Sequence, residues 1–196
     1  MKKLNDLYPG IGTDIVIKRV SINSKEVEPG DLFVCTMGVT ADRHDFIEDA
    51  VKNGASAIVL SKDIKNIEVP TIKVPDTNRE LPYLCQKFYD YPDQKMKMIG
   101  VTGTDGKTST ATIVQTLIGS DTCGYIGTNG RNCAAFSGDN PNTTPDAHIL
   151  YSYLDEFINF NCKYVVSEAS SEAFFRGRLQ AMEYDASVYT NITSEH

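Results

Sequence analysis

The sequence predicts an α/β fold in two parts, of which the second is built on a mostly parallel sheet. Short apolar runs typical of strands alternate with longer segments of helical periodicity, and this order favours parallel strands connected by helices. The pattern breaks once, at the turn-forming stretch around residues 89–94, and then restarts. We therefore predict a small N-terminal α/β domain over residues 1–93 and part of a second, mostly parallel α/β domain over residues 94–196.

The first part alternates strands with two helices. One helix is predicted over residues 44–54, where apolar residues recur at helical spacing and Gly54 supplies a C-terminal stop. A second is predicted over about residues 77–89, with four apolar residues on one face. Alternation and short apolar runs place the strands near residues 14–22, 32–36, 56–61 and 69–74.

The second part begins with a strand, a glycine-rich loop and a helix. Strands continue to alternate with helices up to the last residues, and one loop is rich in Gly, Asn and Pro. The predicted elements are strands 97–102, 123–128, 163–168 and 186–192, helices 107–119 and 146–160, a short helix or turn around 171–182, and loops 103–106 and 129–145.

Composition excludes several classes of protein. The formal net charge of −7 argues against a nucleic-acid binder, whose affinity depends on many Lys and Arg contacts to phosphates. Five cysteines that are odd in number and never spaced C-x-x-C fit reduced thiols rather than a disulfide framework or a zinc cluster. No segment approaches the roughly 20 apolar residues of a membrane span. We expect a soluble, cytoplasmic protein with no membrane partner.

A phosphate-binding loop is the strongest chemical signal. The apolar strand 97–102 runs into Gly103-Thr104-Asp105-Gly106-Lys107-Thr108-Ser109, and a helix follows. Glycines let backbone N–H groups turn inward, and the helix N-terminus adds partial positive charge, so the turn is suited to a triphosphate. Lys107 would reach the β- and γ-phosphates and the Thr108 hydroxyl would bind Mg²⁺. The loop has the shorter G-x-x-G-K-T form, and the alternative is a plain glycine-rich turn with a surface lysine.

Two further residues are candidate metal ligands. Glu168 ends the strand 163–168, and in a parallel sheet its carboxylate emerges at the same edge as the phosphate loop, where it could hold Mg²⁺. The alternative is an ordinary solvated carboxylate. His196 follows the next strand and is a candidate metal ligand or phosphate contact, although a lone His is more often structural. Without an H-E-x-x-H motif or a G-x-S-x-G frame, neither zinc hydrolysis nor a serine nucleophile is predicted.

These motifs together resemble the Mur ligase family, in particular its UDP-N-acetylmuramoyl-tripeptide synthetase branch (the MurE type). V-T-G-T-D-G-K-T at 101–108 resembles the family's phosphate loop. N-S-K-E-V-E-P-G-D-L-F-V at 23–34 resembles D-S-R-x-V-x-P-G-D-L-F-V, and D-R-H-D-F-I at 42–47 resembles D-G-H-x-F-I. Three later segments also match in order: N-T-T-P at 142–145, E-A-S-S at 168–171 and T-N-I-T-S-E-H at 190–196, which resembles T-N-L-x-x-D-H.

The resemblance implies an N-terminal UDP-substrate-binding domain and the first part of a central P-loop-type ATPase domain. It implies an ATP-dependent amide ligase of peptidoglycan precursor synthesis, which adds diaminopimelate or L-lysine to UDP-N-acetylmuramoyl-L-alanyl-D-glutamate through an acyl phosphate, and which acts as a monomer. By position, ATP would contact residues 103–109, and Mg²⁺ would contact Thr108, Glu168 and His196. The residues that would hold the UDP-linked substrate are Ser24, Thr143, Thr144, Ser170, Arg176 and Arg178.

The chain departs from the family pattern at several of these positions. Asn23 and Lys25 replace Asp and Arg beside Ser24, and Asp105 replaces the commoner Asn of the phosphate loop. Glu172 replaces the His that follows the two serines, and Glu195 replaces Asp before His196. Glu172 is either a solvated surface residue or the mark of an altered substrate.

Three alternatives stay open at this stage. Another Mur ligase or a folylpolyglutamate-synthetase-like enzyme would share the central fold, although residues 23–34 argue against the folate branch. A non-catalytic nucleotide-binding module would keep the phosphate loop without the chemistry, and a plain α/β domain would bind nothing. Because the chain stops at a loop after a strand, and the family's amino-acid-selecting domain would lie beyond His196, we also expect a fragment that is inactive alone.

Overall fold

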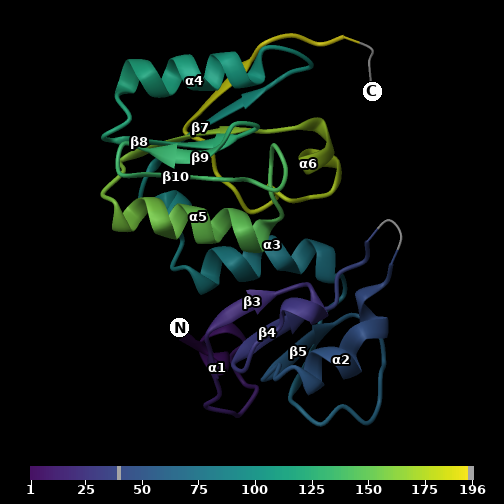
Figure 1. Ribbon diagram of the computed structural model, residues 1–196. Coiled ribbons are helices and arrows are strands. Elements are labelled where there is room, and N and C mark those ends of the chain that lie inside the picture. Colours follow the sequence, from purple (N-terminus) through teal and green to yellow (C-terminus); the bar gives the residue numbers. More distant parts are fainter. Residues whose placement is uncertain (39–40, 194–196) are drawn as a thin grey trace. The chain divides into compact units, whose positions relative to one another are not determined.

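The computed structural model describes residues 1–38 and 41–193 and divides the chain into two compact units, Met1–Phe88 and Tyr89–His196. Each unit has its own sheet and its own helices (Figure 1). The assignment of residues 1–93 and 94–196 to separate binding functions stays a prediction.

The first unit is built on a four-stranded parallel sheet in the order β3-β4-β5-β6. All four residues of β4 and of β5 are buried, as is typical of central strands covered on both faces. Phe33 and Ile58, which are fully buried, pack with Ile47 and Ala50 of the neighbouring helix. The elements are β1 (Lys2–Lys3), α1 (Leu4–Leu7), β2 (Val16–Ile17), β3 (Arg19–Ser21), η1 (Ser24–Glu26), β4 (Asp31–Val34), η2 (Arg43–Phe46), α2 (Ile47–Lys52), β5 (Ala57–Leu60), β6 (Thr71–Lys73) and α3 (Thr77–Phe88).

The second unit contains a six-stranded sheet in the order β10-β9-β8-β11-β7-β12. The four strands β8, β11, β7 and β12 are parallel, whereas β9 and β10 add an antiparallel edge. The elements are η3 (Pro92–Gln94), β7 (Lys97–Thr102), α4 (Lys107–Ile118), β8 (Cys123–Gly127), β9 (Gly130–Cys133), β10 (Phe136–Gly138), α5 (Ala147–Asn159), β11 (Tyr164–Glu168), α6 (Ser171–Phe175) and β12 (Ala186–Tyr189). The mixed α/β class with parallel sheets, predicted from the sequence, is confirmed.

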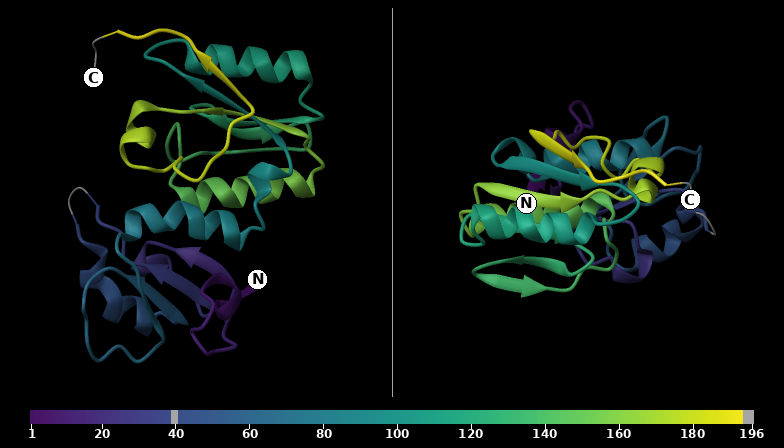
Figure 2. Two further views of the ribbon diagram at one scale, coloured as in Figure 1. Left: turned by 180° about the vertical axis from the view of Figure 1, so that it is seen from behind. Right: turned by 90° about the horizontal axis from the view of Figure 1, so that it is seen from above.

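Helices cover both faces of this sheet, with α4 on one side and α5 on the other (Figures 1 and 2). Successive residues of a strand point to opposite faces. Cys123 and Tyr125 of β8 accordingly pack with Ala111 of α4, while a side chain at Gly124 would collide with Phe157 of α5. The glycine thus permits the close approach of α5.

One predicted loop is wrong in part. The segment 129–145 contains the antiparallel strands β9 and β10, which extend the sheet beyond β8. Its polar residues show no alternation, so the sequence pattern does not indicate strands. The strands form because the exposed backbone of β8 offers hydrogen bonds, and Gly130, with φ of 95°, completes the tight turn between β8 and β9.

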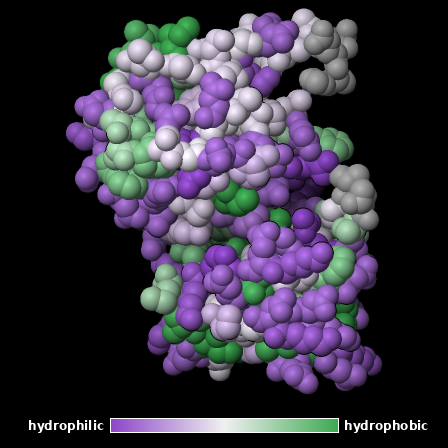
Figure 3. All heavy atoms as spheres, in the orientation of Figure 1, coloured by the Kyte–Doolittle hydropathy of each residue, from purple (hydrophilic) through white to green (hydrophobic). Residues whose placement is uncertain are grey.

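The molecular surface is largely polar on the face shown in Figure 3. The hydrophobic residues of that face lie in small separate groups. Ile113 and Leu117 of α4 are among the exposed apolar side chains, at 58% and 81% exposure. In the part of the chain that the structure describes, no helix has both the length and the apolar character needed to cross a membrane.

Candidate functional site

The glycine-rich loop connects β7 to α4 at the carboxyl end of the sheet. Strand β7 ends at Thr102 and helix α4 begins at Lys107, as the sequence predicts. Gly106 caps the helix with φ of 78°. The first amides of α4, from Lys107 to Ser109, have no carbonyl partner within the helix and carry the positive end of its dipole. The turn therefore presents the N–H groups that anions bind.

The loop is held in place by the segment that follows β12. The amide of Thr104 donates to the carbonyl of Asn191 (3.1 Å), and the amide of Asp105 donates to Asn191 Oδ1 (3.0 Å). The Thr190 hydroxyl donates to the Asp105 carbonyl at 2.6 Å, and the Thr193 amide donates to Thr104 Oγ1 at 3.0 Å. Sequence reasoning gave no role to Thr190 or Asn191, although both stand in a matched motif. Both were predicted to lie within strand 186–192, whereas β12 ends at Tyr189, so that Thr190 and Asn191 follow the strand and reach the loop.

Lys107 folds its side chain back over the loop. Its Nζ donates to the carbonyl oxygens of Gly103 (2.7 Å) and Thr104 (2.8 Å). A lysine ammonium has three donors, so these two contacts leave capacity for a ligand oxygen. The ammonium group thus adds a full positive charge to the site formed by the helix N-terminus.

Glu168 is the hub of the polar network beside the loop. The residue is completely buried. Its Oε1 accepts hydrogen bonds from Tyr125 OH (2.5 Å) and the Thr128 amide (3.0 Å), and its Oε2 accepts from the hydroxyls of Thr108 (2.9 Å) and Thr128 (3.2 Å). Burial and the adjacent Glu168 carboxylate raise the pKa of Tyr125, so the phenol stays a donor. These contacts confirm that Glu168 lies next to the loop, and they rule out an ordinary solvated carboxylate.

The Thr108 hydroxyl and the Glu168 carboxylate carry oxygen atoms of the kind that Mg²⁺ binds. Mg²⁺ prefers oxygen ligands at about 2.1 Å in octahedral geometry, so two neighbouring ligands lie about 3.0 Å apart. Thr108 Oγ1 and Glu168 Oε2 are separated by 2.9 Å. Within residues 1–38 and 41–193, no group of three or more His, Cys, Asp or Glu side chains is placed to hold a metal ion. A cation here would take further oxygens from water or phosphate. His196, the other predicted ligand, lies outside the described residues.

The predicted substrate residues of the second unit gather on the other side of Glu168. Thr144 connects Ser170 to Glu168, because its hydroxyl donates to the Glu168 carbonyl (2.7 Å) and accepts from the Ser170 amide (3.0 Å). Arg178 donates to the Thr144 carbonyl at 2.9 Å. Thr143 Oγ1 lies 3.0 Å from Thr128 Oγ1. The structure thus brings these side chains to the edge of the sheet where the phosphate loop lies.

Ser24 lies in the first unit, in the short helix η1, and is buried. Asn23 caps that helix by accepting a hydrogen bond from the Lys25 amide (3.2 Å), and its Nδ2 donates to Glu26 (2.6 Å). Asn and Asp serve equally well as N-terminal caps. The replacement of the family's Asp at position 23 therefore preserves the local turn.

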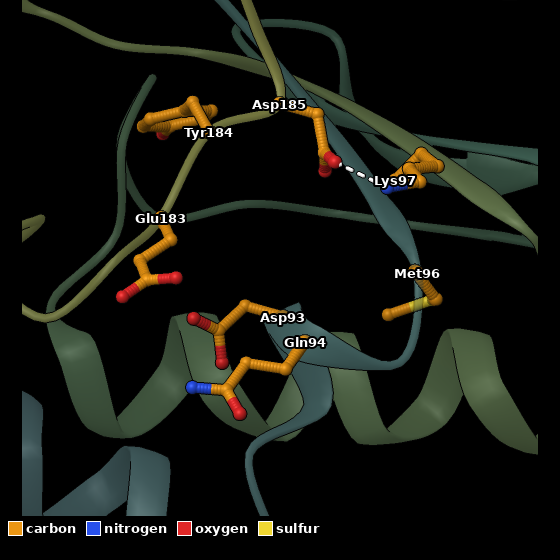
Figure 4. A pocket seen from close by; sticks show the side chains of 7 residues that line it. All are labelled: Asp93, Gln94, Met96, Lys97, Glu183, Tyr184 and Asp185. Atoms are coloured by element: carbon orange, nitrogen blue, oxygen red, sulfur yellow. Dashed lines mark hydrogen bonds and ion pairs between the residues drawn. The ribbon is translucent and has the colours of Figure 1, made fainter.

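A pocket of about 270 Å³ lies at the opposite edge of the sheet, before β7 and β12 (Figure 4). A hydrogen bond from Lys97 (2.5 Å) lowers the pKa of Asp185 there, while Tyr184, whose pKa is raised to about 12 by burial, bonds Ser167 at 3.0 Å. The six residues of β7 separate this pocket from the phosphate loop by roughly 20 Å. The pocket is therefore not part of the candidate site.

Gly103 provides a direct test of the loop geometry. At its φ of 137°, a Cβ would lie 2.1 Å from Thr190 Oγ1 and 2.9 Å from the Asn191 carbonyl oxygen. Gly106 also has a positive φ, but a Cβ there would meet only Thr190, at 4.0 Å. We expect Gly103→Ala to lower the free energy of unfolding by about 2–4 kcal/mol and Gly106→Ala by only about 1 kcal/mol, measured by urea denaturation. Equal losses would contradict the close packing of the loop against the segment after β12.

Comparisons with known proteins agree with this geometry. Residues 101–196 match the Mur ligase middle domain, and residues 16–99 match the domain described as Mur ligase family, catalytic domain. The chain is 37% identical over 192 residues to the UDP-N-acetylmuramoyl-L-alanyl-D-glutamate–2,6-diaminopimelate ligase of Geobacillus thermodenitrificans, covering 97% of this chain and 39% of the relative. The ligase of the same name from Lactiplantibacillus plantarum is 35% identical over 196 residues, covering 99% of this chain and 40% of the relative.

Solved structures show the same relationship. A structure of a UDP-N-acetylmuramoyl-L-alanyl-D-glutamate–2,6-diaminopimelate ligase superimposes with a TM-score of 0.81 at 25% identity, covering all of this chain and 41% of that one. The MurF ligase from Thermotoga maritima, solved in complex with ADP, gives a TM-score of 0.66 at 25% identity over 94% of this chain and 40% of that one. The chain spans about two fifths of the length of the curated relatives it matches. With both of its units matched in sequence and in structure, the chain belongs to the Mur ligase family.

Proposed function

We propose that this chain forms the substrate-binding and ATP-binding part of an ATP-dependent ligase of peptidoglycan precursor synthesis. The observation that carries the proposal is the junction at Glu168. Its side chain accepts from Thr108 at the start of α4, and its backbone carbonyl accepts from Thr144. A single buried residue thereby joins the glycine-rich loop to a cluster that contains Arg178, whose side chain is only 13% exposed.

ATP is the proposed phosphoryl donor, with Mg²⁺ as its counterion. Lys107 and the amides of α4 neutralise phosphate charge, while Thr108 and Glu168 supply oxygen ligands to the cation and His196 a further ligand. When bound, Mg²⁺ supplies charge neutralisation of the transferred phosphate. The residues proposed to contact ATP are Gly103, Thr104, Asp105, Gly106, Lys107, Thr108 and Ser109.

The proposed second substrate is UDP-N-acetylmuramoyl-L-alanyl-D-glutamate, after which the related ligases are named. One of its glutamate carboxylates would attack the γ-phosphate of ATP to give an acyl phosphate and ADP. The amine of diaminopimelate or L-lysine would then attack the acyl carbon, form the amide bond and release inorganic phosphate. Such transfer depends on alignment and charge neutralisation more than on covalent chemistry by the protein. The residues proposed to orient this substrate are Ser24, Thr143, Thr144, Ser170, Arg176 and Arg178.

We further propose that the protein works as a cytoplasmic monomer without a nucleic-acid or membrane partner. The supporting observations are the acidic composition and the five cysteines, all of which are buried free thiols.

Calorimetry with three ligands tests the proposed substrates. We expect saturable binding of Mg-ATP and of UDP-N-acetylmuramoyl-L-alanyl-D-glutamate to the 196-residue chain. UDP-N-acetylmuramoyl-L-alanine, which lacks the glutamate, should bind more weakly because it cannot offer the second carboxylate to the arginines. Equal or tighter binding of the shorter nucleotide would favour another member of the family, and binding of Mg-ATP alone would favour a nucleotide-binding module.

A further inference from the structure

The arginines beside the site are already engaged by a carboxylate of this chain. Glu172 Oε1 lies 2.7 Å from Arg176 Nε and 3.8 Å from an Arg178 terminal nitrogen, so one oxygen stands between two guanidinium groups. Asp146 Oδ1 lies 2.7 Å from Arg178 Nε. Two positive and two negative charges therefore balance in this cluster, although two arginines alone would form a strong anion site.

Arg178 and Glu172 differ in how firmly they are held. The Arg178 side chain is only 13% exposed and also donates to the Thr144 carbonyl, whereas the Glu172 side chain is 58% exposed. The backbone under Glu172 does not depend on its carboxylate, because Ser170 caps α6 by accepting from the Ala173 amide. Glu172 can therefore leave the arginines by rotating its side chain, while Arg178 stays in place.

We propose that Glu172 is a specificity-determining residue that occupies the arginine site as an internal substitute for a ligand anion. This inference rests on the proposed function, in which Arg176 and Arg178 hold the UDP-linked substrate. A substrate carboxylate must displace Glu172 to reach both guanidinium groups. Glu172 thus lowers the affinity for anions and restricts the site to ligands whose other contacts compensate for that displacement.

Removing the charge of Glu172 should strengthen substrate binding. Exposed ion pairs of this kind have a small interaction free energy, so displacing Glu172 costs little and its removal should produce a modest gain in affinity. We expect Glu172→Gln to bind UDP-N-acetylmuramoyl-L-alanyl-D-glutamate about two- to fivefold more tightly than the unmodified chain. Glu156→Gln is the matched control, because Glu156 also pairs with an arginine (Arg131, 2.9 Å) and its replacement changes the net charge equally. Its affinity should equal that of the unmodified chain.

Calorimetry on the three proteins measures these affinities. A Glu172→Gln affinity that is equal to or weaker than that of the unmodified chain overturns the inference, and an equal gain in Glu156→Gln reduces it to a net-charge effect. If no variant binds the nucleotide, the proposed substrate is wrong.

Titration with glutarate, followed by NMR shifts of the amides 173–178, then decides the inference separately. Tighter glutarate binding in Glu172→Gln supports it, and unchanged binding rejects it.

Discussion

Replacing Lys107 with alanine should weaken Mg-ATP binding by roughly 100-fold or more while the chain stays folded. The lysine ammonium lies on the loop carbonyls of Gly103 and Thr104, where phosphate oxygens would be its remaining acceptors. Charge-assisted hydrogen bonds contribute about 1.5–3 kcal/mol each, and about 1.4 kcal/mol corresponds to a tenfold change in affinity. Loss of the one such contact that the third donor can make, together with loss of the full positive charge beside the phosphates, accounts for the expected effect.

Lys97→Ala is the matched control for this experiment. Lys97 lies at the other end of the same strand and pairs with Asp185 on the surface. Calorimetry should give Lys97→Ala an Mg-ATP affinity equal to that of the unmodified chain, and circular dichroism should show cooperative unfolding of both variants. If Lys107→Ala bound Mg-ATP as tightly as Lys97→Ala does, residues 103–108 would not be a phosphate site.

Replacing Glu168 with alanine should produce the largest loss of stability, about 3–5 kcal/mol. The carboxylate is fully buried and accepts four hydrogen bonds, two on each oxygen. Its removal leaves the buried Tyr125 hydroxyl, the partly buried Thr108 hydroxyl and the Thr128 amide without their acceptor. Unsatisfied buried donors cost about 1–3 kcal/mol each, and relaxation or entry of water recovers part of that sum.

Denaturant unfolding monitored by circular dichroism measures this loss. Glu168→Gln keeps the shape but places an NH₂ group against donors, so its stability should also fall. Glu183→Ala removes an exposed carboxylate at the opposite edge of the sheet and should change stability by less than about 0.5 kcal/mol. A Glu168→Ala protein within 1 kcal/mol of the Glu183→Ala control would refute the role of Glu168 as the hub.

The local features of the phosphate loop follow from the sequence. Strand 97–102 and the helix start at Lys107 were predicted at the residues where the structure has them. An apolar strand, a glycine turn and helical spacing each depend on residues within a few positions of one another. The sequence also predicted that Glu168 emerges at the edge of the sheet where this loop lies, because the carboxyl ends of parallel strands meet at one edge.

The contacts that complete the site depend on the tertiary structure. Tyr125, Thr128, Thr190 and Asn191 reach the loop or Glu168 from strands and loops far along the chain, and single polar residues at such positions have no distinguishing pattern. The strands β9 and β10 form because β8 offers a free edge, and their own mostly polar sequence does not predict strands.

By itself, the sequence determined the α/β class, the family and the bounds of the glycine-rich loop between β7 and α4, because these depend on periodicity, glycine geometry and short motifs. Only the tertiary structure decided which donors surround Glu168, and that Glu172 lies between Arg176 and Arg178. The physical reason is that side-chain charges and hydrogen bonds are set by distances across the fold. The separation of two residues along the chain does not reveal how far apart they lie in the fold.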